Sequence, residues 1–244
     1  MTESDTIPPD DFDPGPPVAR ESPRHGFQGD RGASKAPPDL PAGLTVAISR
    51  EAGSRGGTIA LRAGERLGWQ VYPQELLEYI AQEGSFRQQL VEHLSPAASA
   101  WVEAQLDSLL RAQDLSRHPS ILELGRMVLS LGVGGEVVLL GRGAGYILPP
   151  RTTLHVRLIA PLADRIAYMS QWLRLTDEEA VNQVRLRDSR RAEFIATHFH
   201  RKPSDIYQYD LLLNTSLLGE ELCAELIVKA ARAKQAALGF NSDA

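Results

Sequence analysis

The stretch Ser49-Arg-Glu-Ala-Gly-Ser-Arg-Gly-Gly-Thr58 joins a segment typical of a β-strand to a segment typical of a helix. The strand is expected over about 44–49, which is apolar and partly β-branched, and the helix over about 58–67, before Gly68. When a strand, a glycine-rich loop and a helix follow in this order, backbone N–H groups can face an anion and the helix dipole adds partial positive charge. The stretch therefore predicts a loop that binds phosphate.

The loop matches only part of the P-loop pattern G-x-x-x-x-G-K-[ST]. When the pattern is placed over residues 51–58, Gly56 and Thr58 are in register. Glu51 stands where the first glycine belongs, and Gly57 stands where the lysine belongs. Such a degenerate match is weak by itself, so the segments that follow must decide its meaning.

Length and composition are those of an ordinary folded domain. Of the 244 residues, 43% are hydrophobic and 23% are charged, which suits one sizeable domain. The net charge of −5 gives no reason to expect a nucleic-acid partner, and Cys223, the only cysteine, excludes an intrachain disulfide and a cysteine-based metal cage. The sequence has no signal-peptide pattern and no apolar stretch of about 18 residues, so we expect a cytoplasmic protein without a membrane segment.

Residues 1–42 differ in composition from the rest of the chain. They are rich in Pro, Gly, Asp and Arg and contain hardly any aliphatic side chains, so they bury too little apolar surface to offset the entropy of ordering. We expect a disordered tail over 1–42 and one folded domain over 43–240.

Within the domain, segments typical of strands and helices alternate. Strands are expected over about 44–49, 69–72, 136–140, 154–159 and 210–213. Helices are expected over about 58–67, 73–81, 86–115 with a break near 95–96, 120–131, 162–173, 176–199 and 220–237. This alternation predicts an α/β fold with a mainly parallel five-stranded sheet and helices on both of its faces.

Local signals mark two of the helix starts. Ser120 and Glu123 resemble a capping box, and Thr176 precedes a first turn of three acidic residues. The segment 207–215 has two interpretations: its polar residues could line a nucleotide base, or it could be a sheet-edge strand followed by a turn that caps the last helix. We favour the second interpretation.

Gly141-Arg142-Gly143 follows the strand expected over 136–140. Ligands of open α/β sheets bind beyond the carboxyl ends of the strands, and an arginine there can hold two oxygens of one phosphate. A tight turn with a solvent-exposed arginine explains the same residues equally well. Arg142 is therefore a candidate phosphate ligand that the sequence alone does not decide.

A second arginine cluster lies in the helix expected over 176–199. Arg187 and Arg191 are four residues apart, so they share one helix face, where two guanidinium groups suit an anion. Phosphoryl transfer needs such charge to stabilise the transferred group. The alternative is ordinary helix pairing of Asp188 with Arg185 and Arg191, and it is the more common outcome for a run of charges.

Taken in order, these segments resemble the cytidylate kinase-like family of bacterial P-loop proteins, a branch near the true cytidylate kinases. The matching stretches are 48–54 with Gly56, Ile59 and Ala60, then 69–77, 137–143, 154–165, 188–194 and 209–215. The resemblance covers residues 44 to about 230, nearly the whole expected domain.

The resemblance implies a P-loop NTPase fold of the nucleoside-monophosphate-kinase type. A helical region over about 74–133 would bind the nucleoside monophosphate, and a lid region over about 176–202 would carry the arginines. The implied reaction is transfer of the γ-phosphoryl group from ATP, with Mg²⁺ as cofactor, to a nucleoside monophosphate, for which CMP is the first guess. The implied partner is thus a small-molecule nucleotide, and the sequence identifies no protein partner.

The resemblance also implies roles for individual residues. Arg187 and Arg191 would be catalytic, and Arg142 and Asp188 would bind the acceptor. Thr58 would place its hydroxyl on Mg²⁺. The triphosphate would be cradled by Gly53, Ser54, Arg55, Gly56, Gly57 and Thr58.

The chain departs from the family pattern at three positions that usually carry charge. Gly57 replaces a basic residue, for which Arg50 or Arg55 could substitute, and Gly143 and Pro73 replace aspartates. Loss of one phosphate-bridging charge costs about 3 kcal/mol, or roughly a hundredfold in rate. Two alternatives follow: a catalytically degenerate kinase-fold module that binds nucleotide or regulates, and a kinase for another small phosphate acceptor.

Overall fold

The computed structural model describes residues 40–83 and 93–240 of the chain. The tail expected over 1–42 lies almost entirely outside the described residues, as does part of the helical segment expected over 86–115. Within the described ranges, no helix is both long and apolar enough to cross a bilayer.

Strands and helices alternate along the domain, as the sequence predicts. The strands are β1 (Thr45–Arg50), β2 (Gln70–Tyr72), β3 (Val137–Leu140), β4 (Thr153–Ile159) and β5 (Leu211–Asn214). The helices of the first half are α1 (Gly56–Leu67), α2 (Gln74–Gln82), α4 (Pro96–Arg111) and α5 (Pro119–Gly134). Those of the second half are α6 (Ala144–Ile147), α7 (Leu162–Leu173), α8 (Asp177–Phe199) and α9 (Thr215–Ala237), with 3₁₀ turns η1 (Pro150–Thr152) and η2 (Ile206–Gln208).

The five strands form one sheet in the order β2-β3-β1-β4-β5, and every neighbouring pair is parallel. In the centre, Thr45 of β1 is in register with Val137 of β3 and Thr153 of β4. Because the strands are parallel, the loops that follow β1, β3 and β4 leave the sheet at the same edge. The predicted parallel five-stranded sheet is confirmed.

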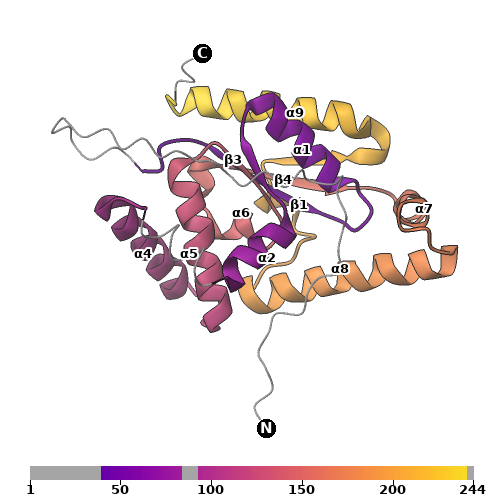
Figure 1. Cartoon of the computed structure of the whole chain (residues 1–244), viewed down its shortest axis with the longest axis horizontal. Helices are drawn as coiled ribbons and strands as arrows, with labels where there is room; N and C mark the ends of the chain where they lie inside the picture. Colours follow the sequence, from indigo (N-terminus) through magenta and orange to yellow (C-terminus); the bar gives the residue numbers. More distant parts are fainter. Residues whose placement is uncertain (1–39, 84–92, 241–244) are drawn as a thin grey trace, which may run out of the picture.

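Helices cover both faces of the sheet, with α1 and α9 on one face and α4, α5 and α6 on the other (Figure 1). Alternate residues of β1 serve the two cores: Val46 and Ile48 pack in the cluster with α1 and α9, whereas Ala47 packs in the cluster with α5. A strand buried on both faces has no polar side, which explains the apolar runs at 46–48 in β1 and at 137–140 in β3.

Two predicted helix caps are confirmed. The Thr176 hydroxyl accepts a hydrogen bond from the Glu179 N–H at the start of α8, and the Glu179 carboxylate accepts one from the Thr176 N–H. Asn214, at the end of edge strand β5, accepts hydrogen bonds from the N–H groups of Ser216 and Leu217 and so caps α9. The segment 207–215 therefore has the structural role that we favoured.

One predicted helix cap is wrong, and helices α1 and α9 begin earlier than expected. The capping box at Ser120 and Glu123 does not form, because α5 begins at Pro119 and the Ser120 hydroxyl is 2.7 Å from Nδ1 of the N-cap residue His118. Helix α1 begins at Gly56 instead of Thr58, because glycine is compatible with the first helical turn. Helix α9 begins at Thr215, but its backbone is not helical at Gly219 (φ 75°), so the helix predicted from Glu220 corresponds to its longer part.

Candidate functional site

The loop between β1 and α1 is a tight turn closed by its own hydrogen bonds. The Ser54 hydroxyl and the Ser54 N–H both donate to the Glu51 carbonyl, at 2.9 and 3.3 Å. Gly53 has a φ of +78°, and a Cβ there would lie 2.6 Å from the Arg165 carbonyl oxygen, so only glycine fits. Helix α1 then begins without a side-chain cap, which leaves its N-terminal dipole directed at this loop.

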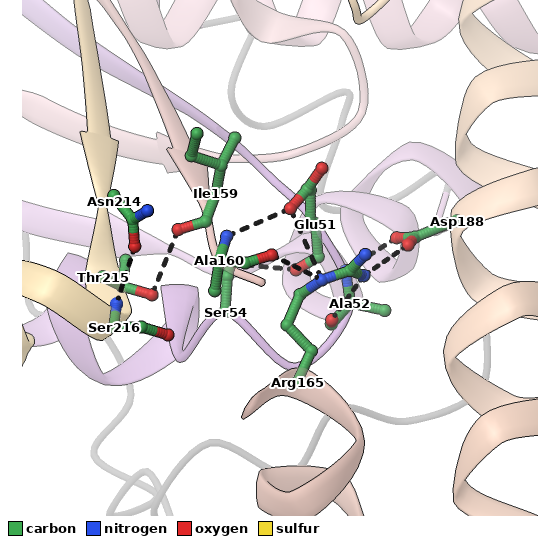
Figure 2. Close-up of polar contacts among 10 residues, drawn as sticks. All are labelled: Glu51, Ala52, Ser54, Ile159, Ala160, Arg165, Asp188, Asn214, Thr215 and Ser216. Carbon is green, nitrogen blue, oxygen red and sulfur yellow. Dashed lines mark hydrogen bonds and ion pairs between the residues drawn. The ribbon is translucent and has the colours of Figure 1, made fainter. Parts of the chain in front are cut away.

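Arg165 of α7 clamps this loop (Figure 2). Its buried guanidinium donates to the Ala52 carbonyl at 3.1 Å and to the Ala160 carbonyl at 3.0 Å. The same group pairs with an oxygen of Asp188 at 2.5 Å, and Glu51 lies 3.4 Å away and accepts the Ala160 N–H. One side chain thus connects the loop after β1, the end of β4 and the long helix α8.

Asp188 has both carboxylate oxygens engaged within the chain. One oxygen accepts the Ala52 N–H at 2.7 Å, and the other pairs with Arg165. The sequence had Asp188 as an acceptor-binding residue or as a partner of Arg185 and Arg191. The structure shows it bound to Arg165 and to the backbone of the loop after β1, and its expected role toward the acceptor stays a prediction.

Arg142 sits in a left-handed turn at the carboxyl end of β3 and is only 8% exposed. Its Nε donates to a carboxylate oxygen of Glu78 on α2 at 2.5 Å, and its Nη2 donates to the same oxygen. The Phe194 ring of α8 lies 4.9 Å from the guanidinium carbon. The alternative of a solvent-exposed arginine at a turn is therefore wrong, because Arg142 is buried and paired.

Gly143, the next residue, has a φ of +70°, and a Cβ there would overlap the ring of Phe199. Phe199 is fully buried at the end of α8. The aspartate that the family pattern has at position 143 therefore has no room in this chain, since Phe199 occupies its space.

A cavity of about 420 Å³ opens at the carboxyl ends of β1, β3 and β4 and is bounded by α8. Four arginines from four elements line it: Arg50, Arg142, Arg157 and Arg191. The carboxylates in the lining, Glu51 and Asp188, are engaged with Arg165 or backbone groups. The cavity therefore carries an excess of positive charge and suits an anionic ligand.

The structure brings some of the predicted site residues together and separates others. Arg142, Asp188 and Arg191 line the cavity. Arg187 is buried and is not among the described residues that line it. The predicted cradle Gly53–Thr58 is likewise outside this lining and forms the neighbouring N-terminus of α1.

Two arginines are candidates to replace the missing lysine. Arg55 lies 3.6 Å from Glu220 and 5.1 Å from the Tyr168 ring centroid, away from the cavity lining. Arg50 packs between the two loops: a Cβ at Gly56 would lie 3.0 Å from its Cγ, and its Nη1 contacts Gly141. Only Arg50 of these two reaches both the α1 N-terminus and the cavity.

A buried histidine forms the wall of the cavity beside β5. The Nδ1 of His155 is 3.0 Å from the Gln208 carbonyl, so this nitrogen carries the proton, and its ring packs on Tyr146 and Tyr209. Burial lowers the pKa of His155 to about 4. Burial likewise raises the pKa of Tyr146, whose hydroxyl donates to Tyr209 because Tyr209 donates to the Pro203 carbonyl. At neutral pH the His155 and Tyr146 side chains are therefore uncharged.

No cluster of three or more metal-ligating His, Cys, Asp or Glu side chains occurs in the described part of the chain. A magnesium ion that accompanies a nucleotide takes most of its ligands from phosphate and water, with one or two from the protein. The half-buried Thr58, in the first turn of α1, fits such a single hydroxyl ligand.

Sequence reasoning missed three residues of this region: Glu78, Arg157 and Arg165. Arg157 lines the cavity and donates to the Ser49 hydroxyl at 2.8 Å. Arg165 had a usable signal, because a basic residue near the start of a helix opposes the helix dipole and needs a compensating partner. Glu78 and Arg157 had none, since their partners are distant in sequence.

Comparisons with known proteins identify a family that matches this chain. The model of the cytidylate kinase-like family matches residues 45–217. A cytidylate kinase of Ignicoccus hospitalis is 26% identical over 184 residues, which cover 75% of this chain and 95% of that protein. A uronate isomerase of Corynebacterium glutamicum is 32% identical over 93 residues, 38% of this chain, and the match spans only 18% of that protein's length.

Among solved structures, an uncharacterized protein of Eubacterium ventriosum has the same fold. It has a TM-score of 0.54 and 16% identity, and the alignment covers 78% of this chain and 98% of that one. The predicted P-loop fold of the nucleoside-monophosphate-kinase type is thereby confirmed. With most of its domain matched by the family model, the chain belongs to the cytidylate kinase-like family.

Proposed function

We propose that the protein transfers the γ-phosphoryl group of ATP to a nucleoside monophosphate, with CMP as the first acceptor to test. The observation that carries the proposal is the arginine-lined cavity at the carboxyl ends of β1, β3 and β4, next to the uncapped N-terminus of α1. A phosphate acceptor would occupy the cavity, and the triphosphate would lie along Gly53–Thr58.

The mechanism rests on positioning and on positive charge. An oxygen of the acceptor phosphate attacks the γ-phosphorus, the bond to the β–γ bridging oxygen breaks, and ADP leaves. Arg142 and Arg191 hold the acceptor phosphate from two sides of the cavity, and Arg157 extends the positive wall. Little covalent chemistry is required of the protein in such a transfer.

Arg50 supplies the bridging charge that Gly57 cannot. It is 5% exposed and lies between the α1 N-terminus and the loop that holds Arg142, where donor and acceptor phosphates would meet. Magnesium bound with the triphosphate would add further neutralisation, and Thr58 is the hydroxyl placed to hold it. Arg187, buried in α8, acts by supporting the helix that carries Arg191.

A second candidate function is a kinase-fold module that binds nucleotide without turnover. It is favoured by a specific observation: Arg142 and Asp188 both have partners within the chain, and no lysine is present at position 57. Under this alternative the protein binds ATP or a nucleoside monophosphate but forms no ADP when both are present.

The test is an acceptor panel. Purified full-length protein with Mg²⁺ and ATP is offered each common nucleoside monophosphate, and ADP formation is measured. We expect acceptor-dependent ADP formation, and we expect Arg191→Ala to lower the rate roughly a hundredfold. Arg185→Ala is the matched control, because Arg185 is an exposed arginine on the same helix and should leave the rate unchanged.

The possible outcomes separate the two candidate functions. ATP binding without ADP formation for every acceptor supports the binding module. Neither turnover nor a thermal shift with ATP contradicts both. Equal rates for Arg191→Ala and Arg185→Ala contradict the role given to Arg191.

A further inference from the structure

Glu78 and Arg142 form an ion pair beside the cavity, at side-chain exposures of 13% and 6%. Nε and Nη2 of Arg142 both donate to one oxygen of Glu78. These two nitrogens form the side edge of the guanidinium group, which is one of the two edges that can hold an anion with a pair of N–H donors. The carboxylate therefore occupies the side edge completely.

Two further contacts fix the orientation of this pair. The Gln74 side-chain amide donates to the same Glu78 oxygen at 2.8 Å, which holds the carboxylate in place on α2. The guanidinium carbon also lies over the Phe194 ring, 4.9 Å from the ring centroid. Glu78 and Phe194 together therefore restrict the movement of the guanidinium group.

The end edge of Arg142, formed by Nη1 and the second Nη2 hydrogen, remains for a ligand. Arg142 lines the cavity, whereas Glu78 does not, so the carboxylate lies behind the guanidinium as seen from the cavity. We infer that Glu78 is a positioning residue that turns the end edge of Arg142 toward the phosphate of the acceptor. The inference rests on the proposed function, because it assigns the acceptor phosphate to this cavity.

The chemistry also sets what Glu78 helps the protein to recognise. An end-on guanidinium edge matches two oxygens of a phosphate monoester, which a neutral nucleoside lacks. A carboxylate behind the guanidinium keeps the buried arginine paired while no ligand is present. Removal of Glu78 should therefore weaken binding of phosphate-bearing ligands and leave binding of the nucleoside unchanged.

A double-mutant cycle tests the inference, with CMP and inorganic phosphate as probes in titration calorimetry on the full-length protein. We expect Glu78→Ala to weaken CMP binding about tenfold and Arg142→Ala roughly a hundredfold, from the charged hydrogen bonds lost. Glu78→Gln, whose amide oxygen still accepts from Nε and Nη2, should recover most of the loss. The double variant should bind no more weakly than Arg142→Ala alone, because Glu78 acts through Arg142.

Two controls complete the experiment. Glu75→Ala alters a carboxylate on the same helix and should leave CMP affinity unchanged, and cytidine should bind Glu78→Ala and the wild type alike. Unchanged CMP affinity in Glu78→Ala, or fully additive losses of affinity in the double variant, overturns the inference. The proposed function still stands in that case if the acceptor panel shows turnover. Wild-type protein that binds neither CMP nor phosphate overturns both.

Discussion

Arg165 is the side chain on which the loop after β1 depends most. It reaches the Ala52 and Ala160 carbonyls and the Asp188 carboxylate, which belong to three separate segments. An arginine can serve three partners at once because its five N–H donors lie in one rigid plane. The loop after β1 is therefore held in shape by a residue more than 100 positions later in the chain.

Arg165→Ala should lower the free energy of unfolding by about 2 to 3 kcal/mol, because it leaves Asp188, the buried Ala52 carbonyl and the partly buried Ala160 carbonyl without this donor. Urea denaturation measures the change. Arg185→Ala, at an exposed position on α8, is the control and should stay within about 0.5 kcal/mol of the wild type. Equal stability of the two variants would show that the clamp does not form.

At the residue scale, the sequence predicted where a side chain lies in the fold better than it predicted which residues that side chain contacts. Arg142 was expected at a strand end because an apolar run stops just before it, and it is there. Glu78 and Phe199, which decide what Arg142 and its neighbour Gly143 can do, contact them only after α2 and α8 pack on the sheet. Such tertiary contacts leave no spacing in the sequence.

At the scale of elements, strands β4 and β5 and the turn η2 form one wall of the cavity around His155. The His155 ring nitrogen donates to Gln208 in η2, and its backbone N–H donates to the Asp210 carboxylate beside β5. Lys234 of α9 pairs with the same carboxylate, 3.0 Å away. A neutral histidine is therefore part of the contact between these elements.

The free energy of unfolding should decrease as the pH is lowered, because of His155. Burial lowers the pKa of His155 to about 4 from an unfolded value near 6.5. As the pH falls, the unfolded chain therefore binds the proton before the folded protein does. The contribution of neutral His155 to the free energy of unfolding is complete above about pH 6.5 and is lost as the pH falls toward about 4. Between about pH 7 and about pH 5 the wild type should lose about 2 kcal/mol more than His155→Asn, which cannot titrate.

Urea denaturation at the two pH values measures this difference. His200→Asn is the matched control, since His200 is an exposed histidine at the end of α8 whose left-handed backbone asparagine tolerates. A His155→Asn variant with the same pH dependence as the wild type would show that His155 is not buried in the neutral form.

The elements themselves were largely predictable. Continuous apolar runs marked β1 and β3, and Thr176 with its acidic turn marked the start of α8. The capping box at Ser120 was wrong because the N-cap residue of α5 is a histidine, and the short helical segment of α9 before the non-helical Gly219 was missed because it follows no simple sequence rule. The roles expected for 74–133 and 176–202 as acceptor-binding and lid regions remain predictions.

At the scale of the whole molecule, the parallel sheet determines where the site lies. The loops after β1, β3 and β4 meet at one edge of the sheet. Helix α8 runs past that edge and places Arg191 in the cavity lining, Phe194 against Arg142 and Asp188 against Arg165. We propose that Arg50, which lies between the α1 N-terminus and the loop that holds Arg142, supplies the charge missing at Gly57. The chain belongs to a kinase-like family, and the arginine-lined cavity supports the proposed phosphoryl transfer.

The most direct measurement follows the label from γ-³²P-ATP in the presence of Mg²⁺, CMP and the full-length protein. We predict that radioactivity appears in CDP, and that Arg50→Ala reduces the rate roughly a hundredfold because it removes the bridging charge. Label that stays in ATP, or that appears only as inorganic phosphate for CMP and every other nucleoside monophosphate, would contradict the proposed transfer.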